Sequence, residues 1–156
     1  MEDYLVYKLV NQHLEIDGLL SALDEKAFHH KIDGKWSILE NIAHLGRYQE
    51  IFFERIELML NRDCPSFPRY IAENDINFSK WHDANLKTIV KDLKTDRDTI
   101  VSLVLMLSSS DFERLGEHPT FGKIAILEWI RFFLYHESHH LYQIFRLKSQ
   151  IKNYKE

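Results

Sequence analysis

The chain has 156 residues, of which 45% are hydrophobic and 28% charged, a length and composition typical of one globular domain with its own core. Its 20 basic and 24 acidic side chains give a formal net charge of −4 and are mixed along the sequence, which does not favour a nucleic-acid partner. No run approaches the ~20 apolar residues of a membrane span, and the first residues lack the pattern of a secretory signal. We therefore predict one cytoplasmic domain over residues 1–156, with no nucleic-acid or membrane partner.

The chain contains a single cysteine, Cys64, which excludes an internal disulfide bond and a zinc site built from several thiolates. Cys64 follows no recognisable base or helix start, so we do not expect it to be a catalytic nucleophile. Any metal ion must then be bound by nitrogen and oxygen atoms.

Apolar residues recur at helical spacing in the first half of the chain. The first such segment covers about residues 4–23. The second begins at Ser37, where Ser37-Ile-Leu-Glu40 is a capping-box pattern, and continues to about Asn61. These spacings predict two long amphipathic helices.

The second half of the chain repeats the helical spacing over about residues 81–107 and about residues 123–151, the latter with Thr120 as its expected cap. The connection over residues 62–80 has no period, contains two prolines, and is long for a simple turn. It should either cross the bundle or cover a functional end. Because no segment alternates with a two-residue period, we predict an all-α four-helix bundle.

Two histidines interrupt the apolar stripe of the last predicted helix. His136 and His140 are one turn apart and lie in the same row as Phe133 and Ile144, which should face the interior. A buried polar group without a partner costs about 1–3 kcal/mol. These imidazoles could therefore bind a metal ion together, or each could be satisfied by hydrogen bonds to neighbouring carboxylates or carbonyls.

A third histidine, His44, lies about 10 Å from the start of the second predicted helix at 1.5 Å per residue. His136 and His140 lie about 20–26 Å along the fourth. The three reach one level only if these helices are antiparallel, which requires up-down-down-up topology with a long crossover between the second and third helices. Three imidazoles and one open position would resemble a catalytic metal centre, and neutral imidazole suits zinc, nickel, iron or copper.

Two further side chains are candidates for the pocket around this site. Arg97 interrupts the apolar stripe of the third helix, where it could bind an anionic substrate or extend its charged end to solvent. Tyr48 follows His44 by one turn and could present its phenol to the pocket or pack as an ordinary aromatic residue.

Three neighbouring polar residues have simpler interpretations. We expect His139 to be a rim or surface residue, although it could also pair with His136 as a ligand. Glu40 could orient His44, but the capping box already explains it. Glu137 should face solvent or a neighbouring helix.

The order and separation of three motifs resemble those of the DinB/YfiT-like superfamily, over nearly the whole chain. The motifs are Trp36-Ser37-Ile-Leu-Glu40-Asn-Ile-Ala-His44-Leu45, His118-Pro119-x-x-Gly122, and Leu127-Glu128-Trp129 leading to His136-x-x-x-His140-x-x-Gln143-Ile144.

The resemblance implies an up-down-down-up bundle, often a homodimer, in which His44, His136 and His140 bind a divalent transition metal, with zinc or nickel favoured. It also implies a metal-dependent reaction of the thiol S-transferase or thiol-dependent isomerase type, with a small-molecule substrate and a low-molecular-weight thiol. The reactive group would be a metal-bound water or thiol. The alternatives are a metal-dependent hydrolase, and a non-catalytic bundle that acts in binding or stress response.

Overall fold

The first helical segment is interrupted near its middle in the computed structural model, which describes residues 1–153. Helix α1 (Asp3–Asn11) continues through the 3-10 turn η1 (Gln12–Leu14) into α2 (Glu15–Leu20), and the short helix α3 (Glu25–His29) follows. The prediction of one continuous helix over residues 4–23 is therefore wrong. The turn buries Gln12, whose side-chain amide donates a hydrogen bond to the carbonyl of Leu134 at 2.8 Å.

Helix α4 (Ile38–Asn61) begins where the sequence predicts. The Ser37 hydroxyl accepts a hydrogen bond from the Glu40 amide at 3.2 Å, and the Glu40 carboxylate accepts one from the Ser37 amide at 2.8 Å. Two of the amides that the first turn would leave without partners are satisfied in this way. The capping box is confirmed. It fixes where α4 begins, and therefore how far along the helix His44 lies.

The connection after α4 carries more structure than its sequence suggests. It contains η2 (Ala72–Asn74) and helix α5 (Ile76–Asp83), and α6 (Leu86–Met106) follows with Asn85 as its cap. The predicted helix over residues 81–107 thus combines the end of α5 with α6. Helix α5 packs tightly on α4, because a Cβ atom at Gly46 would lie 2.1 Å from the ring of Trp81.

A β-hairpin occupies the region before the last helix. After α7 (Ser109–Phe112), strand β1 (Leu115–His118) pairs antiparallel with β2 (Gly122–Ala125), and α8 begins only at Ile126 and ends at Asn153. The expectations of no strand, of a helix from residue 123 and of Thr120 as its cap are wrong. The His118 imidazole closes the turn instead, because its Nδ1 accepts hydrogen bonds from the amides of Thr120 and Phe121 at 3.1 and 3.2 Å.

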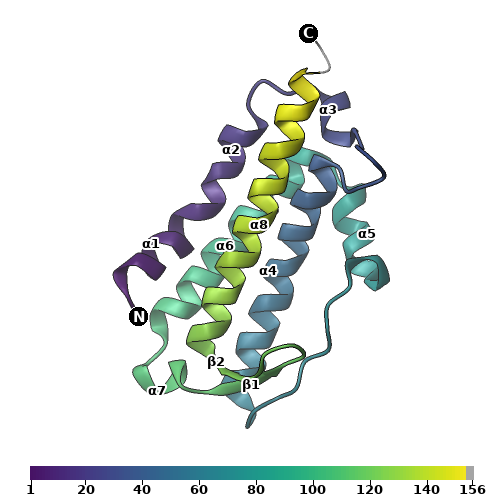
Figure 1. Cartoon of the computed structure of the whole chain (residues 1–156). Helices are drawn as coiled ribbons and strands as arrows, with labels where there is room; N and C mark the ends of the chain where they lie inside the picture. The colour runs from purple at the N-terminus through teal and green to yellow at the C-terminus, as the bar shows by residue number, and fades with distance from the viewer. Residues whose placement is uncertain (154–156) are drawn as a thin grey trace.

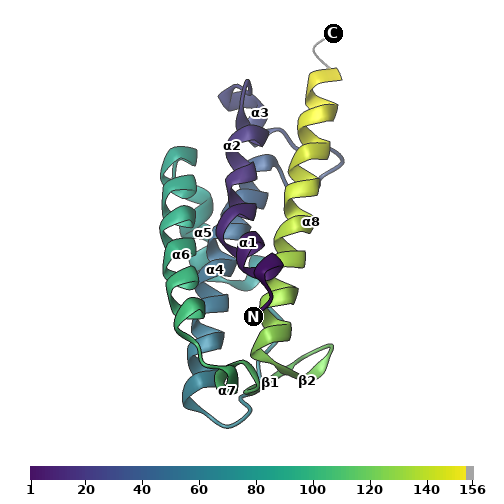
Figure 2. The same ribbon diagram turned by 90° about the vertical axis from the view of Figure 1, so that its left-hand side faces the viewer.

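The four long segments form an up-down-down-up bundle, as predicted (Figure 1). The α1–α2 segment and α8 run in one direction, and α4 and α6 run in the other. The crossover after α4 returns along the outside of the bundle to α5 beside the start of α4 (Figure 1), and the turned view in Figure 2 separates α6 from α8. Helices α4 and α8 are therefore antiparallel neighbours.

Apolar side chains form two large clusters in the core of the bundle. One cluster of buried side chains lies around Phe52, Trp129 and Phe133, and a second lies around Ile42, Leu93 and Ile144. None of the helices over residues 1–153 is long and apolar enough to cross a membrane.

Candidate metal centre

Helices α4 and α8 bring the three predicted histidines together. The Nε2 atoms of His44 and His136 lie 3.0 Å apart, and one ring nitrogen from each of His44, His136 and His140 lies within 4.8 Å of the other two. His44 and His140 are buried, whereas His136 is partly exposed. The level predicted from 1.5 Å per residue in antiparallel helices thus agrees with the arrangement in the structure.

Two of these nitrogens are separated by nearly the distance found between ligands in a tetrahedral zinc site. Zinc–nitrogen bonds of 2.0–2.1 Å place two ligand nitrogens about 3.3 Å apart, close to the 3.0 Å between His44 and His136. The Nδ1 atoms of both rings are buried and have no hydrogen-bond partner among the described residues. An ion bound at the two Nε2 atoms would not contact Nδ1, so the metal-binding interpretation rests on the convergence of the three rings.

His140 is oriented by a side chain on α4. The Asn41 amide group donates to the Ser37 carbonyl at 2.8 Å, which fixes the direction of its oxygen. That oxygen lies 2.9 Å from His140 Nδ1, so the ring nitrogen must be the donor. Nε2 of His140 is then left with its lone pair, in the form that binds metal. The sequence interpretation missed Asn41 as the partner of His140, although it lies about one helical turn before His44.

Burial keeps all three rings neutral. Removal from water lowers the pKa of His44, of His136 and of His140 to about 3, and the neighbouring imidazoles lower each pKa further. Neutral imidazole is the state that binds a divalent ion. Near neutral pH the cluster is therefore ready to bind a metal without first losing protons.

Aromatic rings enclose the cluster. The ring centroids of Trp36 and Tyr70 lie 4.9 and 5.6 Å from that of His44, and the Tyr48 ring lies 4.1 Å from that of His136. Phe78 of α5 also contacts His44 edge-on at 6.4 Å. Tyr48 is buried, and burial raises the pKa of its phenol, which therefore stays protonated. The structure thus brings Tyr48 to the cluster, and its role there stays a prediction.

A cavity of about 360 Å³ borders the cluster at His140. It lies between the connection that precedes α4 and the C-terminal half of α8. Its lining residues are Ile32, Asp33, Lys35, Trp36, Asn41, His139, His140, Gln143, Arg146, Leu147 and Gln150. His139 is an exposed residue at this rim, with its ring 5.1 Å from that of His140.

The family profile of the DinB superfamily matches residues 9–144, most of the chain. The chain belongs to the DinB superfamily. The resemblance inferred from the three motifs is confirmed.

Two relatives illustrate how far this DinB-superfamily chain resembles individual proteins. YuaE of Bacillus subtilis, an uncharacterised protein, is 27% identical over 150 residues, which cover 88% of this chain and 91% of YuaE. The Oceanobacillus iheyensis protein named "Putative metal-dependent hydrolase OB0413" is 28% identical over 129 residues, 80% of this chain and 71% of that protein.

Solved structures support the fold. YfiT of Bacillus subtilis, described as having an unusual four-helix bundle topology, superposes with a TM-score of 0.84 at 18% identity, over 96% of this chain and 87% of YfiT. The four-helix bundle protein TT2238 superposes with a TM-score of 0.66 at 18% identity, over 91% of this chain and 96% of TT2238.

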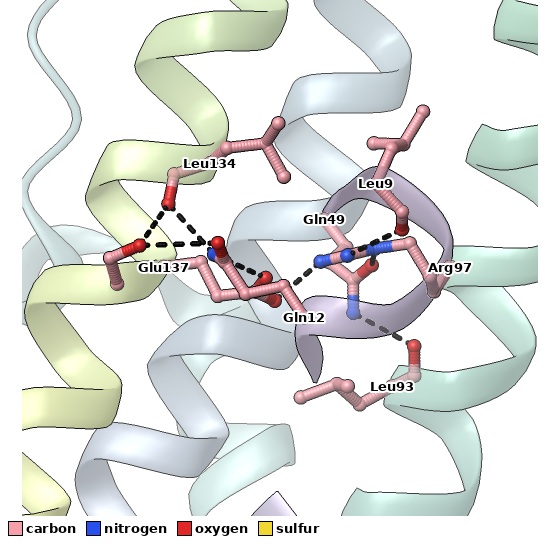
Figure 3. Close-up of polar contacts among 8 residues, drawn as sticks. Leu9, Gln12, Gln49, Leu93, Arg97, Leu134 and Glu137 are labelled. Atoms are coloured by element: carbon pink, nitrogen blue, oxygen red, sulfur yellow. Dashed lines mark hydrogen bonds and ion pairs between the residues drawn. The ribbon is translucent and has the colours of Figure 1, made fainter. Parts of the chain in front are cut away.

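Arg97 lies in a separate polar network on the other side of α8. It is fully buried and forms an ion pair with Glu137. Its Nε atom donates to Gln49 at 2.8 Å, and Nη1 donates to the carbonyl of Leu9 at 3.0 Å (Figure 3). Arg97 does not line the cavity beside His140. We therefore interpret Arg97 as a structural residue that joins α1, α4, α6 and α8.

Glu137 faces the neighbouring helices. Its second oxygen accepts a hydrogen bond from Gln12 at 2.9 Å, and the side chain is almost fully buried (Figure 3). Glu40 is occupied by Ser37 and by Lys31, whose ammonium group lies 2.7 Å away, so it serves the helix start. Cys64 lies half-buried in the loop after α4 with a φ of 42°.

Proposed function

We propose that this protein is a metal-dependent enzyme in which His44, His136 and His140 bind a divalent transition metal, zinc or nickel. One observation carries the proposal: three neutral imidazoles from two helices converge, with one ring nitrogen of each within 4.8 Å of the other two. Three nitrogen ligands leave one coordination position open, as in catalytic zinc sites.

A divalent ion in this position would supply Lewis-acid activation, either by polarising a substrate oxygen or by lowering the pKa of a bound thiol or water. The protein's own contribution is positioning and the exclusion of water. Asn41 orients His140, and the rings of Trp36, Tyr48 and Tyr70 separate the cluster from bulk solvent. The cavity beside His140 would admit a small-molecule substrate.

For the reaction itself we propose thiol transfer or a thiol-dependent isomerisation, with a low-molecular-weight thiol as the nucleophile. Hydrolysis by a metal-activated water commonly uses a carboxylate as general base. Among the described residues, no Asp or Glu belongs to the ligand group, and Asp33 is the only acidic residue that lines the adjacent cavity. A thiol would need no such base, because a coordinating metal lowers its pKa far enough for the proton to be lost to solvent.

Metal-dependent hydrolysis is the second candidate, and the name of OB0413 favours it. The two candidates differ in their requirement for thiol. Metal-loaded protein incubated with a panel of electrophiles and esters, with and without a small thiol, should turn over electrophiles only when thiol is present. Turnover of esters at the same rate without thiol would favour the hydrolase.

Metal content tests the proposed centre directly. Protein purified without a histidine tag and reconstituted with zinc or nickel should retain about one ion per chain after desalting. The His136→Ala/His140→Ala variant should retain none. His139→Ala is the matched control, since it removes an adjacent imidazole outside the ligand group and should leave the ion bound. Equal metal content in all three proteins would contradict the proposal.

We also propose that the protein is a homodimer, as the family resemblance implies. Helices α1 and α8 contact each other and carry exposed aromatic side chains that would contribute to the surface covered by a second copy, namely Tyr4, Tyr7, Tyr135 and Tyr142. Sedimentation equilibrium should give twice the chain mass, and Tyr135→Lys should shift it to the monomer. A monomeric wild-type protein would contradict this proposal. The cytoplasmic location stays a prediction.

A further inference from the structure

The cavity beside His140 extends well beyond the histidine cluster. His140 and Asn41 line it, and along α8 the lining continues through Gln143 and Arg146 to Gln150. The opposite wall is the segment over residues 32–36, which lies next to the C-terminal half of α8 (Figure 1). A molecule whose reactive atom reaches His140 would therefore extend along this part of α8.

A tight turn fixes the wall opposite α8. Asp33 and Gly34 have φ values of 53° and 67°, and the Lys35 amide donates to the carbonyl of Ile32 at 3.0 Å. Two consecutive left-handed residues closed by this hydrogen bond are the arrangement of a type I′ turn, for which Asp-Gly is a preferred pair. The next residue, Trp36, stacks on His140 with 6.0 Å between ring centroids and on Phe78 with 5.7 Å. Lys35 is thus held between a rigid turn and an anchored indole.

The charges in this cavity favour an anion. Lys35 and Arg146 line it, and neither has an ion-pair partner among the described residues. Asp33 is the only acidic residue of the lining. The proposed metal ligands are all neutral, so no carboxylate would offset the charge of a divalent ion. The cavity is therefore positive in a protein whose formal net charge is −4.

A larger cavity on another side of α4 has the opposite character. It measures about 700 Å³ and contains four carboxylates, those of Glu50, Glu54, Asp92 and Asp96, with Arg47 and Lys80 as its only basic residues. The positive character of the smaller cavity is thus a local property of the segment that leads to the histidines.

We propose that the substrate of the metal centre carries an oxyanion group, a carboxylate or a phosphate, that binds to Arg146 and Lys35 while the reactive atom lies at the histidine cluster. This inference rests on the proposed function. Arg146 follows His140 by six residues, about 9 Å along the helix axis. The anionic group should therefore be separated from the reactive atom by a spacer rather than lie next to it.

The test uses zinc-loaded protein and two thiols of the same chain length, one ending in a carboxylate and the other in a hydroxyl group. The thiol of 6-mercaptohexanoate or of 6-mercaptohexanol can bind at the open coordination position whichever reaction the enzyme catalyses. Isothermal titration calorimetry at low salt should give a Kd about tenfold lower for the acid, the gain expected from one charge-assisted hydrogen bond. Raising the ionic strength to 1 M should reduce this preference, because the interacting groups are exposed.

Substitutions in the cavity should change the acid preference and leave binding of the alcohol unchanged. Arg146→Gln should reduce the preference, and Arg146→Gln/Lys35→Gln should abolish it. Asp33→Asn should increase it, since asparagine retains the left-handed turn and removes the cavity's negative charge. Lys91→Gln on α6 is the control for net charge, since Lys91 is exposed and lies outside the cavity lining.

The readouts separate the subsite from the centre. If zinc is bound and the acid and alcohol have equal Kd values, or if Arg146→Gln/Lys35→Gln retains the full preference, the anion subsite is wrong and the metal centre stands. If the wild-type protein retains neither zinc nor nickel, the proposed function is wrong and the subsite with it. Thermal unfolding of each variant identifies any that fails to fold, and Asp33→Asn then provides an independent gain-of-binding test.

Discussion

Two buried polar clusters lie on neighbouring faces of α8, the histidine cluster and the Arg97 network. Two consecutive residues of the helix each belong to one of them. His136 points to the histidine cluster, whereas Glu137 belongs to the Arg97 network. In the network, the ion pair is supplemented by hydrogen bonds from Gln12 and to Gln49. In the histidine cluster, ring nitrogens of two of the three side chains have no described partner. The Arg97 network is thus satisfied by groups within the chain, whereas the converging nitrogens of the histidine cluster form the proposed site of a metal ion.

Disrupting the Arg97 network should have the largest effect on stability. Arg97→Met leaves the Glu137 carboxylate buried without its counter-ion, which should lower the free energy of unfolding by about 3–5 kcal/mol. Arg97→Met/Glu137→Gln should recover part of this loss, since the remaining side chain is neutral. Urea unfolding of the zinc-loaded proteins measures both values. A loss below 1 kcal/mol for Arg97→Met would show that the Arg97 network does not stabilise the fold as proposed.

Removing the metal should destabilise the protein through the histidine cluster alone. An ion at 100 times its Kd stabilises the folded state by about 2.7 kcal/mol, because it binds the folded state selectively. A strong chelator should therefore lower the Tm of the wild-type protein and of Arg97→Met. The loss in free energy of unfolding should be similar in the two proteins. It should not affect His136→Ala/His140→Ala. A chelator effect that persists in this double variant would place the metal elsewhere.

The wall that α5 forms next to the histidines should depend on Gly46. Gly46→Ala introduces a methyl group 2.1 Å from Trp81, and such overpacking costs about 1–3 kcal/mol. Displacement of α5 would also move Phe78 away from His44. We expect faster metal release and a shift in Trp81 fluorescence, and Gly46→Ala/Trp81→Leu should reverse the stability loss. If metal release is unchanged in Gly46→Ala, α5 does not enclose the cluster.

The smallest effect concerns His13, which is buried and has an unpartnered Nδ1. Burial, with a further contribution from Arg97, lowers the pKa of His13 to about 4. The unfolded chain, with a histidine pKa of about 6.5, binds more protons than the folded state below that pH, so stability falls as the pH drops from about 6.5 to 4. At pH 5.5 the loss is about 1 kcal/mol.

His13→Leu should remove this contribution to acid sensitivity. Urea unfolding at pH 7.5 and pH 5.5 should show a loss that is smaller in the variant than in the wild-type protein. Both should be measured at the same zinc concentration, so that the three ligand histidines, which also take up protons on unfolding, contribute equally in the two proteins. An equal loss in both proteins would assign the acid sensitivity to other groups.

The helical period and one rule of geometry were sufficient to predict the histidine cluster. The residues that carry the period are buried in long helices, so the levels of His44 and His140 follow from 1.5 Å per residue once the topology is antiparallel. The hairpin was missed because strands of four residues are too short for alternation to be visible, and because Thr120 resembles a helix cap. The interpretation of Arg97 depended on Glu137, a partner 40 residues away that no local pattern identifies.

The separation between the two ligand-bearing helices has a kinetic consequence. His44 and His136 are 92 residues apart, so an ion bound between them closes most of the chain into a loop. Closing a long loop is entropically costly, and contacts of such sequence separation form late unless they belong to the folding nucleus. Interactions absent from the transition state slow unfolding and leave the folding rate nearly unchanged. Bound metal should therefore lower the unfolding rate and leave the folding rate nearly unchanged.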